Sequence, residues 1–409
     1  MTTESRTPDT PPTWRDPKRY LWLWGLFAPT GLFTIGLPLT WLFGSLGWSG
    51  PVHVLFWLGP LVLYLVIPLA DRLFGQDATS PPEEVLAALE NDKYYRYLTY
   101  LYLPCQYATL VAVCFLLTAG ELPVPGLEDG LGTVDKVGLA LTVGVIGGIG
   151  INTAHELGHK KVGLERRLSR IALAQSAYGH FYVEHNRGHH VRVATPEDPV
   201  SARFGEGFWA FLPRAVLGSL RSAWQLERAR LARLGSGPWS RRNEVLTAWL
   251  LTVVLYAALI AAFGVVLLPF LLLQAVMGVG LLEAVNYLEH YGLVRQRTSS
   301  GRYERPAPRH SWNSDNVVTN VFLYHLQRHS DHHAHPTRRY QALCSRERVP
   351  VLPTGYAGMI LLAYFPPLWR RVMDKRVLAL YDGDITRVNI HPPARRRLLA
   401  RYGVVAAAE

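Results

Sequence analysis

Cysteine is scarce in this sequence, with three residues in 409. Cys105, Cys114 and Cys344 form no CxxC pair, so neither a disulfide framework nor a thiolate metal site is expected. Internal repeats are also lacking, and biased composition is confined to the Pro/Thr-rich start and the closing Ala406 to Ala408. These absences argue against a disulfide-stapled secreted domain, a zinc ribbon and a repeat array.

The N-terminus has no pattern typical of a cleaved leader. Met1 to Arg19 is polar and Pro-rich, and the first apolar run after it has full membrane length. We therefore expect this first run to stay in the protein as a membrane span.

Long apolar runs are the main feature of the sequence. Hydrophobic residues make up 49% of the sequence, and they gather in blocks that reach the roughly 20 residues an apolar helix needs to cross a bilayer. The predicted spans are about 21–46, 52–70, 97–119, 136–154, 245–264 and 265–288. The last two are separated only by Gly264 to Pro269, so a re-entrant hairpin is the alternative to two crossings. We predict an all-α polytopic membrane protein of one domain, in which residues 155–244 and 289–409 form a helical cap.

Charge predicts the orientation of these spans. The formal net charge is +11. The basic flanks are Arg15, Lys18 and Arg19 before the first span, Arg72 and Lys93 between the second and third, and Lys160 to Arg242 after the fourth. The other loops are Ser49 to Pro51, the acidic Glu121 to Asp135 and the uncharged Gly264 to Pro269. Because basic loops stay in the cytoplasm, we expect both termini and the cap to be cytosolic. The same charge also suits anionic lipid or an acidic soluble protein, and sequence alone does not separate the two.

The fifteen histidines are clustered instead of scattered. The first motif, His155-Glu156-Leu157-Gly158-His159, follows directly on the fourth span. In a helix its i, i+4 spacing puts both imidazoles on one face, where they can share a metal.

Two further motifs repeat this pattern. The second contains His185, His189 and His190, and the third contains His329, His332 and His333. Each spacing brings three rings to one side of a helical turn. His290, at the end of the sixth span, is an additional candidate. Eight histidines in three motifs, and nine with His290, exceed what one metal ion can use, and all lie toward the predicted cytosolic side.

Imidazole suits zinc, copper, iron and nickel, so the ligand type alone does not name the metal. Polar residues within the motifs are expected to orient the rings or offset the metal charge: Glu156, Glu184, Glu289, Asp331 and Asn286. The other six histidines are expected to be surface or structural residues: His53, His180, His310, His325, His335 and His391.

The motifs resemble those of the integral-membrane alkane hydroxylases, also called alkane 1-monooxygenases. HELGHK at 155–160, EHNRGHH at 184–190 and LQRHSDHHAHP at 326–336 are similar to the three histidine boxes of that family. NYLEHYGL at 286–293 is similar to its additional signature, which the related membrane desaturases do not share.

This resemblance implies a reaction and a ligand set. It implies that the nine histidines named above hold two non-heme irons, without heme or flavin in this chain. The implied reaction is terminal hydroxylation of medium-chain n-alkanes to 1-alkanols with dioxygen, in the bacterial inner membrane. Electrons would come from rubredoxin, separate or fused beyond residue 409, with an NAD(P)H-dependent rubredoxin reductase upstream. The candidates for lining an apolar passage are Phe56, Trp57, Leu58 and Tyr64.

Several alternatives remain at this stage. HELGH also matches zinc proteases, in which the glutamate activates water, although such a site does not need so many histidines. A metal transporter would place its ligands inside the spans, which carry few ionisable residues apart from Glu283. A desaturase or an aryl-methyl hydroxylase is the nearest rival reaction. No nucleic-acid partner is expected.

Overall fold

The computed structural model of the chain describes residues 14–402, so the closing Ala406 to Ala408 and the first thirteen residues lie outside it. The described part is helical, without a strand and with only isolated β-bridges. Six helices are long and apolar enough to cross a membrane: Leu21–Ser45, Ser49–Phe74, Lys93–Thr118 (α7), Thr133–Gly158 (α8), Glu244–Phe263 (α13) and Val265–His290, which is mostly α14 (Leu268–His290). The predicted fold class is thus confirmed, with the second and fourth spans each extending four residues further toward the C-terminus than expected.

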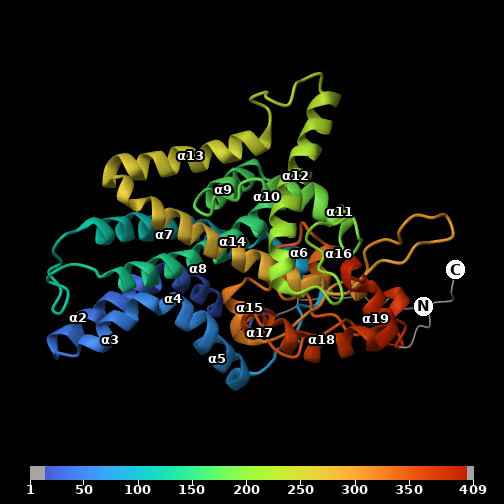
Figure 1. Cartoon of the computed structure of the whole chain (residues 1–409), viewed down its shortest axis with the longest axis horizontal. Helices are drawn as coiled ribbons and strands as arrows, with labels where there is room; N and C mark the ends of the chain where they lie inside the picture. Colours follow the sequence, from blue (N-terminus) through green and yellow to red (C-terminus); the bar gives the residue numbers. More distant parts are fainter. Residues whose placement is uncertain (1–13, 403–409) are drawn as a thin grey trace, which may run out of the picture.

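The six helices lie side by side along the long axis of the molecule (Figure 1). The loops that join them at one end are residues 46–48, 119–132 and the turn at Gly264. α13 and α14 form a helical hairpin in which Gly264 takes a φ of +91°, a conformation that glycine adopts most readily. Each arm of this hairpin is long enough for a full crossing. The cap and the histidine motifs lie at the opposite end.

Prolines break the first two spans into short segments. The first comprises η1 (Leu21–Leu26), α1 (Phe27–Gly31), η2 (Leu32–Gly36) and α2 (Leu37–Ser45), and the second comprises α3 (Ser49–Val54), η3 (Leu55–Trp57), α4 (Leu58–Leu61), η4 (Val62–Val66) and α5 (Ile67–Phe74). Proline lacks a backbone N–H, and its ring clashes with the carbonyl four residues earlier. Accordingly, η2 before Pro38 and η4 before Pro68 are both π-helical, which widens the turn.

Helix α8 is the centre of the bundle. Of its membrane window 83% is buried, compared with 17% for α13 at the edge. Small residues allow α14 to approach it closely: a Cβ added at Gly144 would lie 2.5 Å from the Met277 side chain, and one at Gly278 would lie 3.2 Å from the Gly144 carbonyl. The helix that carries the first histidine motif is therefore held rigidly on several sides.

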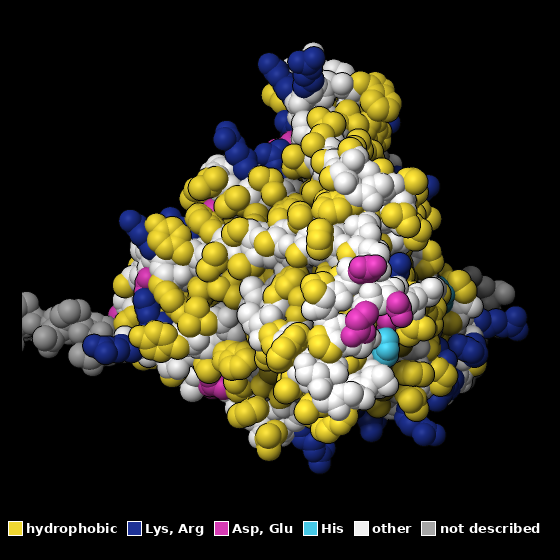
Figure 2. Space-filling view, turned by 90° about the vertical axis from the view of Figure 1, so that its left-hand side faces the viewer, with side chains coloured by type: hydrophobic (Ala, Val, Ile, Leu, Met, Phe, Trp, Pro, Cys, Tyr) yellow, Lys and Arg dark blue, Asp and Glu magenta, His cyan; other side chains and the backbone are white. Residues whose placement is uncertain are grey.

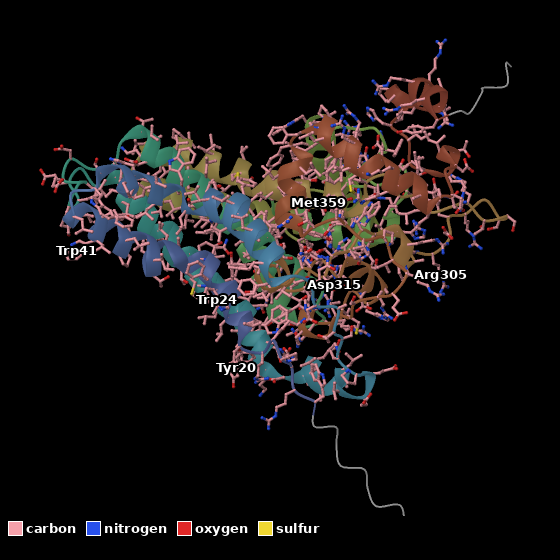
Figure 3. The ribbon with its side chains drawn as sticks, turned by 90° about the horizontal axis from the view of Figure 1, so that it is seen from below. Tyr20, Trp24, Trp41, Arg305, Asp315 and Met359 are labelled. Atoms are coloured by element: carbon pink, nitrogen blue, oxygen red, sulfur yellow. The ribbon has the colours of Figure 1, made fainter. Side chains whose placement is uncertain are left out.

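The molecular surface matches a membrane setting. Figure 2 looks at the end away from the cap, where apolar side chains dominate, a small acidic group surrounds one histidine, and Lys and Arg lie at the periphery. Exposed aromatic residues mark both ends of the first span: Tyr20 and Trp24 toward the cap, and Trp41 at the far end (Figure 3). Tyrosine and tryptophan favour the two membrane boundaries, so this distribution outlines an apolar belt.

The cap is built from short helices between and after the spans. They are α6 (Glu83–Asn91), α9 (Gly163–Ala174), α10 (Phe181–Glu184), η5 (His185–His189), α11 (His190–Arg192), α12 (Phe208–Arg233), α15 (Val317–Phe322), α16 (His329–Ala334), α17 (Tyr356–Ala363), α18 (Pro366–Leu380) and α19 (Arg395–Arg401), with short 3-10 turns η7 (Pro308–His310), η8 (Tyr340–Ala342), η9 (Ile385–Arg387) and η10 (Pro392–Ala394). Buried aromatic residues join the cap to α14: the Trp369 ring lies 4.9 Å from that of Tyr287 and 5.3 Å from that of Tyr291. This core fixes the C-terminal part of the chain against the end of the sixth span.

Candidate metal centre

The first motif occupies the last turn of α8. His155 lies in the helix and His159 is its C-terminal cap residue, so the two rings lie one turn apart, edge to face, with centroids separated by 4.7 Å. His155 and His159 therefore lie on one face of α8, as their spacing predicted. Glu156 points elsewhere: its Oε1 lies 3.0 Å from Nζ of Lys160 and accepts a hydrogen bond from the Tyr340 backbone N–H.

The second motif is π-helical. η5 covers His185 to His189, and His190 begins α11. Single π-helical turns are rare and are frequent at functional sites. The wider turn sends the rings in two directions, because His185 and His190 join one group of histidines and His189 joins another. The spacing had predicted a stripe of ligands that could feed two adjacent ions, and the structure does divide the three rings between two groups; the π-helical turn decides which ring joins which group.

The third motif and His290 complete the two groups. α16 carries His329, His332 and His333, while His290 is the last residue of α14. The first group contains His155, His159, His185, His190 and His332, and the second contains His189, His290, His329 and His333. Within each group the candidate ligand nitrogens lie within 4.8 Å of one another. The structure thus brings together all nine histidines that the sequence singled out.

The Nε2 atoms converge at short range. In the first group the Nε2–Nε2 distances are 3.0 Å for His155 and His332, 3.1 Å for His185 with either His159 or His190, and 3.2 Å for His190 and His332. Two nitrogens each about 2.1 Å from one ion are about 3.0 Å apart at a right angle and about 3.4 Å apart at a tetrahedral angle. The spacing therefore suits an ion with more than four ligands. The two groups adjoin, since the His190 and His333 rings are 4.5 Å apart.

The hydrogen bonds at Nδ1 of His290 and of His189 show that Nε2 of each ring carries a lone pair. Nδ1–H of His290 donates to the His310 carbonyl at 3.0 Å, and Nδ1–H of His189 donates to Oδ2 of Asp198 at 2.9 Å. A neutral ring protonated at Nδ1 has a bare Nε2. Nε2 of His290 nevertheless faces Nε2 of His329 at 3.2 Å, and Nε2 of His189 has no hydrogen-bond partner among the described residues. Facing lone pairs need a cation between them, so the residues present fit a bound metal.

Burial keeps six of the candidate ligand histidines neutral. Desolvation, together with the neighbouring histidines, lowers the pKa well below the ordinary value for His159, His185, His190, His329, His332 and His333. A neutral imidazole is the form that binds metal. Near neutral pH these rings are therefore available as ligands without first losing a proton.

Of the polar residues expected to orient the rings, one contacts a ligand ring. Oε1 of Glu289 lies 3.2 Å from Nδ1 of His329. Asp331 instead forms ion pairs with Arg338 and Arg346, which tie the third motif to the following loop. Glu184 pairs with Arg192 at 2.8 Å.

The fifth of these residues, Asn286, also turns away from the histidines. Its side-chain amide donates to Glu283, which accepts a second hydrogen bond from the Tyr178 hydroxyl at 2.7 Å. Asn286 and Glu156 therefore support the surroundings of the site and not the ligand rings.

Asp198 orients a ligand histidine, which was the role expected of the carboxylates inside the motifs. It is fully buried, and the Ser201 hydroxyl donates to the same oxygen that His189 reaches. Burial alone would raise the pKa of Asp198, but His189 and Ser201 hold it below its usual range. Sequence reasoning missed this residue because it lies nine positions after His189, outside any helical period.

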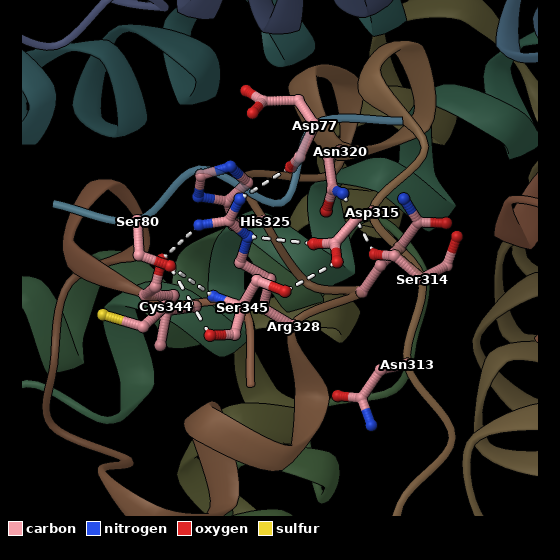
Figure 4. A network of polar contacts seen from close by, with 12 residues as sticks. Asp77, Ser80, Asn313, Ser314, Asp315, Asn320, His325, Arg328, Cys344 and Ser345 are labelled. Atoms are coloured by element: carbon pink, nitrogen blue, oxygen red, sulfur yellow. Dashed lines mark hydrogen bonds and ion pairs between the residues drawn. The ribbon is translucent and has the colours of Figure 1, made fainter. Parts of the chain in front are cut away.

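Arg328 anchors the third motif from the residue directly before His329. Its side chain is buried, and it donates to the backbone carbonyls of Leu343, Asp77 and Thr79 while lying 3.4 Å from the Asp315 carboxylate. Figure 4 shows this network, which joins the loop after the second span to the segment around Cys344. The position of α16 is therefore set by segments far apart in the sequence.

The six remaining histidines lie outside both groups, as expected. His53 pairs with Asp135 near the far end of the bundle, and His391 lies 3.8 Å from Glu206. The other four contact nearby groups. His310 contacts Glu304, and His325 contacts the Tyr340 carbonyl. His335 contacts Arg346, and His180 contacts the rings of Tyr178 and Trp249.

An apolar cavity of about 70 Å³ opens directly beside the histidines. His155, His185 and His329 form part of its wall. The rest is mostly aliphatic or aromatic and comes from the second span, α8, α14, α15 and α17. A second cavity of about 50 Å³ shares Leu63, Ile67, Val145, Ile149 and Phe322 with the first and continues between the first two spans and α8. The two spaces together form an elongated apolar passage that ends at the metal centre.

The four residues expected to line such a passage have different positions. Leu58 lines the second cavity, but Phe56, Trp57 and Tyr64 line neither. Phe56 is buried in a neighbouring core cluster, and Trp57 packs against Gly138. The Tyr64 hydroxyl is hydrogen-bonded to that of Tyr364. Phe56, Trp57 and Tyr64 therefore pack against other parts of the bundle and not against the passage.

Comparison with known proteins first shows the broad class of membrane protein to which the chain belongs. The sequence model of the fatty acid desaturase family matches residues 136–404, which include all nine histidines. The chain is thus a membrane protein of the histidine-rich desaturase type.

Closer relatives specify the family. An alkane 1-monooxygenase of Acinetobacter baylyi is 45% identical over 390 residues, which cover 95% of this chain and 92% of the relative. An alkane 1-monooxygenase of Ectopseudomonas oleovorans is 44% identical over 407 residues, covering 100% and 97%. The xylene/toluene monooxygenase hydroxylase component of Pseudomonas putida is more distant, with 26% identity over 230 residues, covering 56% and 60%. The chain belongs to the alkane 1-monooxygenase family, which confirms the resemblance seen in the four histidine motifs.

Proposed function

We propose that the protein hydroxylates the terminal methyl group of medium-chain n-alkanes at a centre of two irons held by the nine histidines. The observation that carries this proposal is the position of the two groups of histidines at the end of an elongated apolar passage. Five donors in one group exceed the four of a usual zinc site, and imidazole is a ligand that iron accepts.

The residues of the chain then have distinct tasks. Two irons, when bound, would bind and reduce dioxygen and supply the oxidant. The aliphatic walls around Leu281 and Ile360 bind the alkane chain and exclude water from the reacting end. Asp198 orients His189 through its hydrogen bond to Nδ1, so that Nε2 faces the metal, and Glu289 lies beside Nδ1 of His329.

The reaction needs electrons as well as oxygen. One terminal C–H bond becomes C–O–H, and the second oxygen atom leaves as water after taking up two protons and two electrons. We infer that rubredoxin supplies these electrons, reduced in turn by an NAD(P)H-dependent rubredoxin reductase. His190 and His333 are the half-buried members of the two groups, and the exposed Val191 and the basic Arg338 and Arg346 lie close to them in the chain. An acidic carrier could dock there by charge attraction.

Product analysis tests the proposal. The full chain in lipid vesicles is incubated with octane, labelled dioxygen, rubredoxin, its reductase and NADH, and iron is measured in the same preparation. We expect 1-octanol with one labelled oxygen atom, and about two irons per chain. Alkenes as the sole product would contradict the proposal in favour of a desaturase, and one zinc without iron would favour a protease.

The remaining alternatives have specific outcomes. The distant relative named for xylene and toluene makes aryl-methyl oxidation the second candidate, so toluene is tested beside octane. A protease is disfavoured because Glu156 is bonded to Lys160 and the Tyr340 backbone and does not face the metal site. Metal uptake into vesicles, abolished by His329→Ala, would support a transporter.

We also propose that the cap and both termini are cytosolic, in the inner membrane of a bacterium. The alternation of basic and non-basic loops supports this orientation, because the far-end loops contain no Arg or Lys. A reporter active only in the periplasm is expected to work when inserted after Gly130 and to fail when inserted after Gly301. The reverse pattern would invert the orientation.

The passage predicts a chain-length effect. Val62 lines the second cavity, whereas Val66 on the same helix is 51% exposed. We expect Val62→Phe to lower the rate with hexadecane by about tenfold and to change the rate with octane by less than about twofold. Val66→Phe is the matched control and should leave both rates unchanged. Equal losses on the two alkanes would show that the second cavity does not hold the far part of the substrate.

A further inference from the structure

We propose that a groove between α12 and α13 binds one molecule of an anionic phospholipid from the leaflet next to the cap. The groove is open to the surface and is lined by Leu217, Leu220, Arg221, Trp224, Gln225, Arg228 and Trp249. It is separate from the cavities at the histidines, with which it shares no residue.

The position of α12 places the groove at the membrane boundary. α12 runs across the ends of the spans, while α13 runs along them (Figure 1). α13 has 20 residues and is therefore about 30 Å long, equal to the hydrocarbon thickness of a bilayer, so its first residues mark the boundary. Trp249 is the sixth residue of α13, about 8 Å inside that boundary. The groove thus spans the level where headgroups give way to acyl chains.

The groove has one apolar part and one cationic part. Leu217, Leu220, Trp224 and Trp249 offer aliphatic and aromatic surface, of which Leu217 is 64% exposed. Arg221 and Arg228 are seven residues apart on α12 and thus two turns apart on one face. An acyl chain matches the first part, and a lipid phosphate matches the second.

The two arginines are available for a ligand. On the same helix Arg214 pairs with Glu206 and Arg230 pairs with Glu227. Arg221 and Arg228 are exposed and form no ion pair or hydrogen bond with other residues in the range 14–402. Guanidinium groups bind phosphate oxygens strongly because they offer two parallel N–H donors. Negative charge on the lipid therefore complements two cationic side chains of the groove that have no ion-pair partner among residues 14–402.

The groove lies on the back of the second histidine motif. Ser222, next to Arg221, accepts a hydrogen bond from Arg192 just after that motif. The Trp249 ring contacts His180, which precedes α10. A lipid held in the groove therefore stabilises α12 against the segment that carries His185 to His190.

Native mass spectrometry of the full chain in detergent tests the proposal. Phosphatidylglycerol, phosphatidylcholine with the same acyl chains and inorganic phosphate are the probes. We expect one phosphatidylglycerol retained per chain, about thirtyfold weaker binding in the double variant Arg221→Gln/Arg228→Gln, and no displacement by inorganic phosphate. The double variant Arg233→Gln/Arg241→Gln is the control, because it removes the same charge from exposed residues that do not line the groove.

Three results would overturn the proposal. These are equal retention of the two lipids, equal losses in the two double variants, or displacement of the lipid by inorganic phosphate. An unchanged lipid affinity with a raised KM for the electron carrier would instead assign the two arginines to protein docking. Elution volume and melting temperature verify that each variant is folded.

Discussion

His290→Ala is expected to remove one of two bound irons and to lower alkane hydroxylation by about 1000-fold, since several kcal/mol of metal-supplied stabilisation is lost. His290 supplies one of only four nitrogens in its group, and its ring is fully buried between His189, His329 and His333. Loss of its Nε2 leaves three donors, while the five-histidine group is untouched. Iron content per chain and the rate with octane, measured on one preparation, verify this result.

The control for His290→Ala is His53→Ala. His53 is a half-exposed histidine paired with Asp135, outside both groups, so its removal should leave iron and rate unchanged. Full iron content in a folded His290→Ala protein would show that His290 is not a ligand. Loss of both irons would show that the two groups bind metal cooperatively.

Asp198→Ala is expected to weaken metal binding by the four-histidine group by about 10- to 100-fold. Asp198 accepts the Nδ1–H of His189 and thereby fixes both the tautomer and the orientation of that ring. Without the carboxylate, Nδ1–H of His189 loses its buried acceptor, and the ring can turn its Nε2 away. Iron release in the presence of a chelator, followed over time, measures the change in affinity.

A conservative variant distinguishes an effect on the orientation of the His189 ring from an effect on packing. Asp198→Asn keeps the size of the side chain and one oxygen acceptor, so it should retain more iron than Asp198→Ala but less than the unchanged protein. Ser201→Ala removes the neighbouring donor and should have a smaller effect, because Val200 also donates to Asp198 through its backbone N–H. Equal iron retention in all of these proteins would remove Asp198 from the set of positioning residues.

The sequence predicted the spans and the histidines well because both depend on local rules. Apolar length decides where a chain can cross a bilayer, and every predicted span lies within or close to an observed helix. Helical spacing also brought His155 and His159 to one face, as α8 shows. His290, which has no histidine at helical spacing in its own segment, was a candidate from its position at the end of the sixth span, and the resemblance then placed it in the ligand set.

Features that depend on tertiary contacts could not be predicted in this way. The division of the second motif between two groups follows from a π-helical turn, which no spacing rule signals. Asp198 reaches His189 through the fold of a loop, and Glu156, besides its i, i+4 partner Lys160, accepts a hydrogen bond from the distant Tyr340 backbone N–H. The lining of the passage also differs from expectation, because the first two spans contain five prolines and change helical type along their length.

Those prolines also affect how the passage can respond to its substrate. The π-helical segment Val62–Val66 and the helix that follows it contribute Val62, Leu63 and Ile67 to the cavity walls. A backbone with missing or longer-range hydrogen bonds deforms at a lower free energy than a regular α-helix. The opposite wall, formed by the tightly packed α8 and α14, is rigid by comparison. Under the proposed function, entry of an alkane therefore needs only a local adjustment of the second span, while the histidines at the ends of α8 and α14 stay in place.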